Sequence, residues 1–354
     1  MSSEASNYSQ SVEEPEDHPT FGGESGHWVS SREDGEEECC LTFDEATRGL
    51  CMLGKNDSGL KYSYLMLNVS EKGLTDISII PTFRNVIFVN VSGNRLTRAA
   101  LQVFSSMTYL LMIQADRNRI TLPDLEPMVY LQVLTLNDNE ISETSGIGHR
   151  LLECLELNRN RIRRVSLSPY VLENLRVLEL RGNLLTTTNG IFFPSLVALY
   201  VAENRIERFE GLVTLVNLKT LHARGNRISV LDGFATSCVK LSYVNLRENR
   251  IARLAEFGKL RCLQSLETIV VSQNPVVNAL PDDEDEDDAA GYRVKLIAMI
   301  PNLVRIDKGV VSDDERKDAE ALRRRIVQDG SGFPEIDEDS TSAKISNGGS
   351  VMNA

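Results

Sequence analysis

The residue types that most often carry out acid–base, nucleophilic or metal chemistry are sparse in this chain of 354 residues. Of its four histidines, His18 and His27 lie in an acidic N-terminal segment and His149 follows Gly148 in a predicted loop. His222 stands on a predicted strand and points away from the core, but no Cys or Asp is placed to complete a triad with it. The sequence has no HExxH, no CxxC pair and no GxxxxGK[ST]. We therefore predict no catalytic residues and no enzyme activity.

Metal and cofactor chemistry has equally little support. The run DDEDEDD at 282–288 is rich in carboxylates, but it lacks the glycine and the spaced ligands of an EF-hand loop. We predict a solvated loop, no metal site and no cofactor. The cysteines are scattered and are not gathered at both ends of the chain, which favours free thiols in a reducing compartment. They are Cys39, Cys40, Cys51, Cys154, Cys238 and Cys262.

The dominant pattern is a repeat of the form LxxLxLxxNxL, as in LQVLTLNDNEI at 131–141. Its asparagines are 21 to 25 residues apart, the period of a leucine-rich repeat. They are Asn94, Asn118, Asn139, Asn160, Asn183, Asn204, Asn226, Asn249 and Asn274. A tenth, atypical unit comes first, with Leu65, Leu67, Leu74 and Ile77 at the apolar positions and Lys72 in place of the asparagine.

The physical chemistry of this spacing predicts a solenoid. The LxL pair alternates as a short strand does, and one unit cannot bury its apolar side without neighbours. The asparagine can hydrogen-bond backbone groups at the turn that follows the strand. We predict an α/β fold: a leucine-rich repeat solenoid with a curved parallel sheet, a helical or irregular convex side, and helical caps at both ends.

Charge divides the chain into a basic body and acidic attachments. Residues 1–40 hold eleven acids and one base, 282–288 hold seven acids, and 329–354 hold five acids and one base. The rest has 36 basic and 28 acidic residues, although the whole chain has a formal net charge of −13. No stretch is apolar enough for a membrane helix and the N-terminus lacks a signal-peptide pattern, so we expect a cytoplasmic protein that does not engage membranes.

Both ends of the repeats carry segments that can cover the exposed core. In LTFDEATRGLCML, Thr42 and Glu45 are spaced as a capping box, and helical spacing aligns an apolar face. That face consists of Phe43, Ala46, Leu50 and Leu53. Downstream, Val294, Ile297, Ile300 and Leu303 are placed to seal the last repeat. Ser312 and Glu315 begin a final helix, whose Arg323, Arg324 and Arg325 complement its C-terminal dipole.

These features predict six segments. They are an acidic disordered arm (1–40), an N-terminal cap helix (41–63), the repeats (64–276), an acidic loop (277–291), a C-terminal cap and helix (292–328), and a disordered tail (329–354).

Several segments resemble known proteins. NRIERFEGL at 204–212, followed by NP and by YRxxxIxxxPxL from Tyr292, is similar to the intracellular leucine-rich repeat class with a short C-terminal cap. LTFDEATRGLCML, GLTDISII (73–80), ENLRVLELRGNLLTTTNGI (173–191) and LRENRIARLAEFGKL (246–260) resemble the leucine-rich repeat-containing protein twenty-three family. Members of that family are structural components of ciliary radial spokes. The acidic insert at 282–288 and both tails depart from the family pattern.

Two surfaces are candidates for partner binding. The residues that flank the core positions of the strands point to the concave face, where the C-terminal repeats gather arginine and aromatic side chains of the kind enriched in interfaces. This concave cluster consists of Arg181, Tyr200, His222, Arg224, Tyr243 and Arg247. Six of the nine residues that follow the asparagines are arginines, which predicts a basic ridge along one edge. The ridge consists of Arg95, Arg119, Arg161, Arg205, Arg227 and Arg250.

The sequence and the resemblance together predict a non-enzymatic scaffold of the ciliary axoneme, a radial spoke component in the cytoskeleton. Expected partners are axonemal proteins with acidic surfaces; nucleic acid is disfavoured because the aromatic side chains lie away from the ridge and the flanking arms are acidic. The alternative is a regulatory subunit that docks an enzyme, such as a protein phosphatase, on the concave face.

Overall fold

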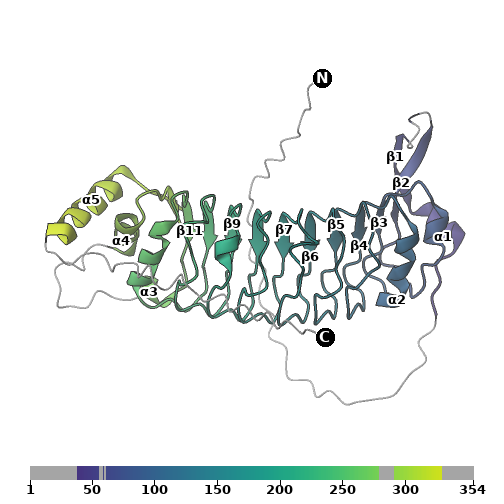
Figure 1. Cartoon of the computed structure of the whole chain (residues 1–354), viewed down its shortest axis with the longest axis horizontal. Coiled ribbons are helices and arrows are strands. Elements are labelled where there is room, and N and C mark those ends of the chain that lie inside the picture. Colours follow the sequence, from purple (N-terminus) through teal and green to yellow (C-terminus); the bar gives the residue numbers. More distant parts are fainter. Residues whose placement is uncertain (1–37, 56–58, 60, 279–290, 329–354) are drawn as a thin grey trace, which may run out of the picture. The chain divides into compact units, whose positions relative to one another are not determined.

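The computed structural model describes residues 38–55, 59, 61–278 and 291–328. These residues form a sheet of 13 strands whose spatial order follows the chain order from β1 to β13 (Figure 1). Strands β2 to β12 are parallel, and each terminal strand is added antiparallel. The stack of one strand per repeat confirms the predicted solenoid.

The strands of the repeats are three residues long, apart from the first. The sheet consists of β1 (Leu50–Lys55), β2 (Tyr62–Asn68), β3 (Phe88–Asn90), β4 (Met112–Gln114), β5 (Val133–Thr135), β6 (Cys154–Glu156), β7 (Val177–Glu179), β8 (Ala198–Tyr200), β9 (Thr220–His222), β10 (Tyr243–Asn245), β11 (Thr268–Val270), β12 (Arg305–Ile306) and β13 (Gly309–Val310). Since β2 pairs in parallel with β3, the unit that contains Lys72 is stacked as the first repeat.

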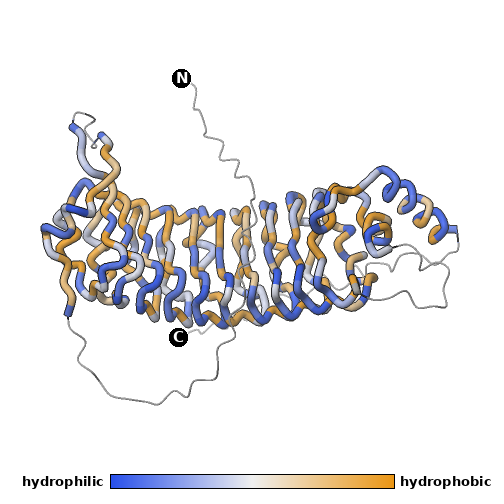
Figure 2. Tube along the Cα trace, turned by 180° about the vertical axis from the view of Figure 1, so that it is seen from behind, coloured by the Kyte–Doolittle hydropathy of each residue, from blue (hydrophilic) through white to orange (hydrophobic). Residues whose placement is uncertain are grey.

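Short helices and 3-10 turns connect the strands along the stack. The helices are α1 (Phe43–Arg48), α2 (Arg98–Leu101), α3 (Pro275–Asn278), α4 (Tyr292–Met299) and α5 (Asp313–Gln328), with 3-10 turns η1 (Ile80–Thr82), η2 (Gln102–Ser106), η3 (Leu212–Thr214) and η4 (Leu254–Cys262). Helices α1, α4 and α5 lie at the two ends of the stack (Figure 1). Figure 2 shows hydrophobic residues recurring in successive turns of the chain along the stack. Among the described helices, none has both the length and the apolar character needed to cross a lipid bilayer.

The repeat asparagines join neighbouring turns of the chain. The Asn118 side-chain oxygen accepts the backbone N–H of Leu96 in the preceding repeat at 3.0 Å. Its amide donates to the carbonyls of Val91, also in the preceding repeat, and of Ala115 in its own, both at 3.1 Å. The asparagine from Asn94 to Asn274 is buried in every repeat. The predicted turn function of these residues is confirmed, and each of them also bonds one repeat to the next.

The residue before each asparagine adopts the left-handed backbone conformation in all nine repeats. Six of these residues are not glycine: Arg117, Asp138, Arg159, Glu203, Glu248 and Gln273. A non-glycine residue with positive φ is strained unless its surroundings stabilise it. The asparagine bonds on both sides of the turn supply that stabilisation.

The N-terminal cap differs from the predicted helix. The Thr42–Glu45 capping box is present, but α1 ends at Arg48, and Leu50 and Leu53 lie on β1 rather than on a helical face. Strand β1 pairs antiparallel with β2 and forms a hairpin that projects beyond the stack (Figure 1). The expectation failed because Gly49 caps the helix, and residues that alternate in a strand also fit a loose helical spacing.

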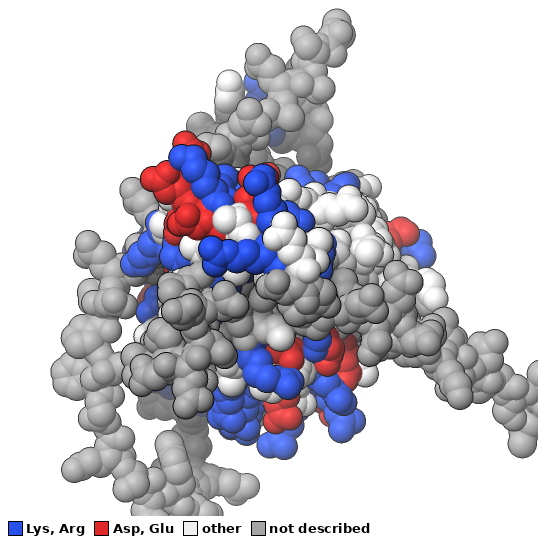
Figure 3. All heavy atoms as spheres, turned by 90° about the vertical axis from the view of Figure 1, so that its left-hand side faces the viewer, with Lys and Arg blue, Asp and Glu red and all other residues white. Residues whose placement is uncertain are grey.

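The C-terminal cap seals the last repeat as predicted. Ile297, Ile300 and Leu303 are buried, whereas Val294 is only partly buried against the core, and α4 adds the buried Leu296. Ser312 and Glu315 form the expected capping box of α5: the Glu315 carboxylate accepts the Ser312 N–H at 2.8 Å. Viewed from this end, acidic and basic side chains intermingle near α5 (Figure 3).

The acidic arm, the acidic loop with 282–288, and the tail lie largely outside the described residues. Cys39 and Cys40, which we assigned to the arm, belong to the folded body, because the Cys39 N–H bonds the Thr75 hydroxyl at 2.9 Å and Cys40 bridges to Asp76.

Candidate protein-binding surfaces

The sheet has one buried face and one outer face. In each strand from β3 to β11 the middle residue is buried, and the first and third residues are half-buried, except for the buried Thr135 of β5. The concave cluster lies on this outer face, over strands β7 to β10. Its six members come from four successive repeats, and the stacking of the repeats brings them together.

Three rings of the cluster form a continuous stack. His222 on β9 lies between Tyr200 on β8 and Tyr243 on β10, with ring centroids 4.9 Å apart on both sides. Tyr200 and His222 are paired across neighbouring strands, whereas Tyr243 is in register with Thr220, so its ring reaches His222 diagonally. The result is an aromatic surface across three repeats.

The ring stack is uncharged at neutral pH. Burial lowers the pKa of His222 to about 4 and raises the pKa of Tyr200. A neutral imidazole between two phenols offers flat apolar area with polar edges, which suits packing against aromatic or apolar side chains. It carries no proton donor or nucleophile arrangement of the kind that a triad requires.

The arginines of the cluster already have carboxylate partners within the chain. Arg224 forms two hydrogen bonds of 3.0 Å to Glu248, and Arg181 bonds Glu203 at 2.6 Å. Arg247 also lies 3.6 Å from Glu248. Neither Glu203 nor Glu248 is among the residues predicted for the cluster. Their signal was available, since each stands directly before a repeat asparagine and so lies one turn away from an arginine of the preceding repeat.

The basic ridge is formed by the backbone contacts between repeats. The backbone N–H of each ridge arginine bonds a carbonyl of the preceding repeat, for example Arg205 to Leu185 at 2.8 Å. All six arginines are exposed. Arg161 pairs with Glu140 at 3.0 Å, and such exposed pairs contribute little to stability.

A further feature of the outer face, absent from the predicted surfaces, is an apolar row. Eight residues in register across β1 to β8 are apolar or cysteine, and from β3 onward each is the first residue of its strand. The row consists of Cys51, Met66, Phe88, Met112, Val133, Cys154, Val177 and Ala198. Its signal in the sequence is the residue before the central leucine of each repeat, such as Val133 in LQVLTL.

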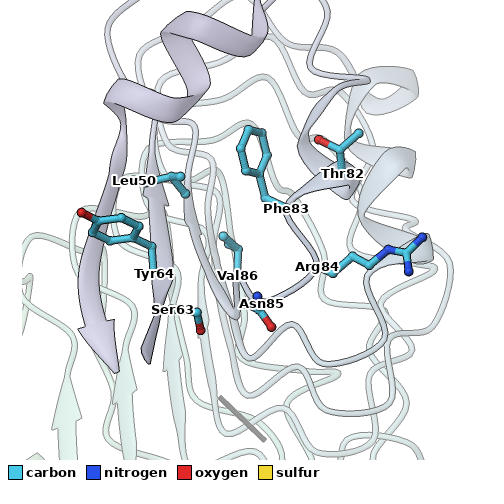
Figure 4. A pocket seen from close by; sticks show the side chains of 8 residues that line it. All are labelled: Leu50, Ser63, Tyr64, Thr82, Phe83, Arg84, Asn85 and Val86. Carbon is cyan, nitrogen blue, oxygen red and sulfur yellow. The ribbon is translucent and has the colours of Figure 1, made fainter. Parts of the chain in front are cut away.

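A pocket of about 470 Å³ lies between the β1–β2 hairpin and the segment before β3 (Figure 4). Leu50 and Tyr64 of the hairpin and Phe83 and Val86 of the segment form much of its lining. Its position at the N-terminal end of the stack separates it from the ring stack by many repeats.

Two partly buried thiols and one buried histidine are held in unreactive states. Burial raises the pKa of Cys154 to about 12 and of Cys262 to about 11, so both thiols are protonated. His149 is fully buried and its Nδ1 accepts the Met128 N–H at 3.1 Å. Within the described ranges, no three His, Cys, Asp or Glu side chains are grouped to hold a metal ion.

Comparison with known proteins agrees with this architecture. The family profile described as "Leucine-rich repeat" matches residues 195–326. Leucine-rich repeat-containing protein 23 of Homo sapiens is 36% identical over 300 residues, which cover 84% of each chain. The chain belongs to the leucine-rich repeat-containing protein 23 family. The family member of Xenopus tropicalis is 38% identical over 277 residues, covering 78% of this chain and 76% of that one.

A solved structure supports the fold alone. The functional domain of InlJ from Listeria monocytogenes has a TM-score of 0.51 and 18% identity, and covers 69% of this chain and 53% of that one. Membership of the leucine-rich repeat-containing protein 23 family and the open stack of strands both support a protein-interaction scaffold, and neither points to an enzyme family.

Proposed function

We propose that this protein is a structural component of the ciliary axoneme, in the radial spoke, where it holds neighbouring subunits on the outer face of its sheet. The observation that carries the proposal is the family match at 36% identity over 84% of the chain. The resemblance to spoke components noted in the sequence extends from the N-terminal cap to the last repeats.

The ring stack is the proposed anchor for one partner. Tyr200, His222 and Tyr243 give neutral, half-buried aromatic area, and tyrosine is among the residues that dominate binding energy at interfaces. The flanking arginines bind a partner carboxylate only in exchange for Glu203 or Glu248. The partner therefore presents an apolar or aromatic side chain to the rings, with acidic groups at the edge.

Fractionation of cilia tests the cellular function. Detergent followed by salt should leave the protein with the axoneme and release it together with spoke subunits. Recovery entirely in the detergent-soluble fraction, bound to a phosphatase, would instead establish the regulatory-subunit alternative.

Substitution of one ring tests the anchor. Tyr243→Ala removes the end of the stack and should weaken incorporation into the axoneme about thirtyfold, equivalent to about 2 kcal/mol. Tyr243→Phe keeps the ring and should retain most of the binding. Tyr170→Ala is the matched control, because Tyr170 is 88% exposed and lies outside the cluster.

Two further variants separate the two surfaces. If Arg119→Ala on the basic ridge weakens incorporation more than Arg224→Ala does, the docking surface is the ridge. Each variant must first show the circular dichroism and melting temperature of the parent protein, so that loss of folding is not taken for loss of binding.

A further inference from the structure

The N-terminal half of the outer face differs from the half that holds the ring stack. Its apolar row runs from Cys51 on β1 to Ala198 on β8, and from Met66 onward its members are half-buried. At about 4.8 Å per strand, the part from Met66 to Ala198 is roughly 29 Å long. The row ends where the ring stack begins, because Tyr200 and Ala198 belong to the same strand.

One flank of the row is acidic. Glu156 and Glu179 are the third residues of β6 and β7, whose first residues belong to the row, and Asp116 follows β4. Their carboxylates accept hydrogen bonds from neutral donors: the Asn137 amide to Glu156 at 2.8 Å, the Asn158 amide to Glu179 at 2.7 Å, and the Asn137 backbone N–H to Asp116 at 2.7 Å.

These carboxylates differ from the acidic residues of the C-terminal half. There, Glu203 and Glu248 are ion-paired with arginines. On the N-terminal half, burial raises the pKa of Asp116 and of Glu156, and for Asp116 this desolvation outweighs the opposing charge of Arg117. A partner that brings further cations to this flank would offset the desolvation of these carboxylates.

The other flank of the row is apolar. In the turns that lead into β4 and β5, the rings of Tyr109 and Tyr130 stack with centroids 5.8 Å apart, although both are exposed. Val129, next to Tyr130, and Leu151, in the turn that leads into β6, are also exposed, at 63% and 38%. The apolar surface is therefore widest over β4 to β6 and is bounded by negative charge on one side only.

The hydrogen bonding of the sheet determines which kind of partner segment can bind to its outer face. The backbone N–H and C=O groups of neighbouring strands already bond one another, so the outer face offers a partner only side chains. An extended segment lying on the apolar row would leave its own amides unpaired, whereas a helix satisfies them internally. About 20 helical residues span the row at 1.5 Å per residue.

We propose that the outer face of β2 to β8 binds an amphipathic helix of a partner protein, whose apolar side packs along the row and whose Lys or Arg flank faces Asp116, Glu156 and Glu179. This inference rests on the proposed function as a scaffold and adds a second docking surface beside the ring stack.

Peptide binding to the full-length protein tests the proposal. The probe is a fluorescent 20-residue helical peptide with leucines on one side and lysines along one flank, compared with the same helix carrying glutamates instead and with a scrambled lysine peptide. Fluorescence anisotropy should show at least tenfold tighter binding of the lysine helix than of either comparison peptide. Preference for the glutamate helix, or equal binding of the scrambled peptide, would overturn the proposal.

Variants locate the binding. Val133→Arg, in the middle of the row, should weaken the lysine helix about tenfold, whereas Thr220→Arg, in the same register on β9, should not. The double change Glu156→Gln and Glu179→Gln keeps an oxygen acceptor for each asparagine amide. It should also weaken binding of the lysine helix about tenfold, and it should reduce the salt dependence of that binding. Glu207→Gln, an exposed carboxylate after the Asn204 turn, is the matched control.

Failure of this inference is distinguishable from failure of the proposed function. If the row variants bind the peptide as the parent does while Tyr243→Ala still abolishes incorporation into the axoneme, the amphipathic-helix site is excluded and the scaffold function stands. If the protein is absent from the axoneme but its row still binds the lysine helix with the predicted selectivity, the surface is retained and the cellular assignment is wrong.

Discussion

The hydroxyl of Tyr292 donates a hydrogen bond of 2.8 Å to one oxygen of the Asp307 carboxylate. The other oxygen accepts the backbone N–H groups of Val271 and Ser272, both at 2.8 Å. In an inner repeat the equivalent N–H group, that of Val91, bonds a carbonyl of the next strand. Strand β12 is only two residues long, so Asp307 takes the place of the missing carbonyls and joins the last repeat to α4.

Replacing Asp307 should destabilise this end of the stack. Asp307→Ala leaves two backbone N–H groups without their acceptor and puts alanine at a φ of 54°, so we expect a loss of about 2 to 3 kcal/mol. Asp307→Asn keeps an oxygen acceptor and tolerates this φ, and should cost less. Urea unfolding measures both; equal losses for Ala and Asn would show that the carboxylate side chain does not cap the strand.

Replacing a buried asparagine of the stack should destabilise the fold far more than replacing an exposed asparagine. The Asn160 oxygen accepts the Ile141 N–H at 3.0 Å, and its amide donates to the Leu136 carbonyl at 2.9 Å. Asn160→Ala leaves these buried groups unpaired, which costs roughly 1 to 3 kcal/mol for each. Asn174→Ala removes a single exposed bond to Arg150 and should cost less than about 0.5 kcal/mol. The prediction fails if the urea midpoints of the two variants coincide.

The buried imidazole of His149 should make stability depend on pH. Burial lowers its pKa to about 4, while the unfolded chain titrates near 6.5. Because the unfolded state binds the proton more tightly, stability is complete above about pH 6.5 and falls as the pH drops towards 4. The free energy of unfolding that this fully buried group loses when it becomes protonated is roughly 3 kcal/mol.

His149→Gln tests this dependence. Glutamine retains an acceptor for the Met128 N–H but does not titrate, so the loss of stability between pH 6.5 and 4 should shrink. His222, whose pKa is also about 4, contributes in the same direction, so some dependence should remain. A variant with an unchanged pH profile would exclude His149 as the titrating group.

The final helix should respond to stronger acid. The Arg293 guanidinium, which bonds Glu315 at 2.6 Å, lowers the pKa of that carboxyl to about 2, with help from the Ser312 N–H. The stabilisation is therefore present above the ordinary value of 4.5 and is lost as the pH falls from 4.5 to 2. Glu315→Gln should remove this acid dependence.

Hydrogen exchange of the α5 amides at pH 5 and pH 3 measures the effect. Exchange should accelerate at pH 3, after correction for the intrinsic rate, in the parent protein and in the control Glu320→Gln. Glu320 pairs with Arg324 on the exposed side of α5, with side chains 65% and 72% exposed, and such pairs stabilise little. A parent protein whose corrected exchange is the same at both pH values would contradict the prediction.

Much of the fold was predictable because its determinants are local. The LxL pair and the asparagine act within one repeat and its immediate neighbour, so their spacing alone specifies strand, turn and stack. The Thr42 and Ser312 capping boxes are likewise encoded within four residues. The β1–β2 hairpin was missed because its evidence is the pairing of Leu53 with Tyr64, which is invisible to a local pattern.

The surfaces were predicted less completely for a related reason. Aligning the repeats brought Tyr200, His222 and Tyr243 together correctly, since register determines which side chains are neighbours. The same alignment places Glu203 and Glu248 one turn away from the arginines, but the ion pairs also depend on the rotamers of long side chains, which the position in the repeat does not specify. The apolar row was missed because its members look like ordinary strand formers within any single repeat.

The hydrogen bonds of the repeat asparagines give the stack a direction in which it can fold during synthesis. The acceptor for the Leu96 N–H is on Asn118, and the acceptor for the Ile251 N–H is on Asn274, so each repeat receives this group from the repeat that follows it. A nascent chain leaves the ribosome N-terminus first. Each repeat must therefore wait for another 21 to 25 residues to emerge before its turn is complete, and the advancing edge of the growing protein is always one repeat short of folded.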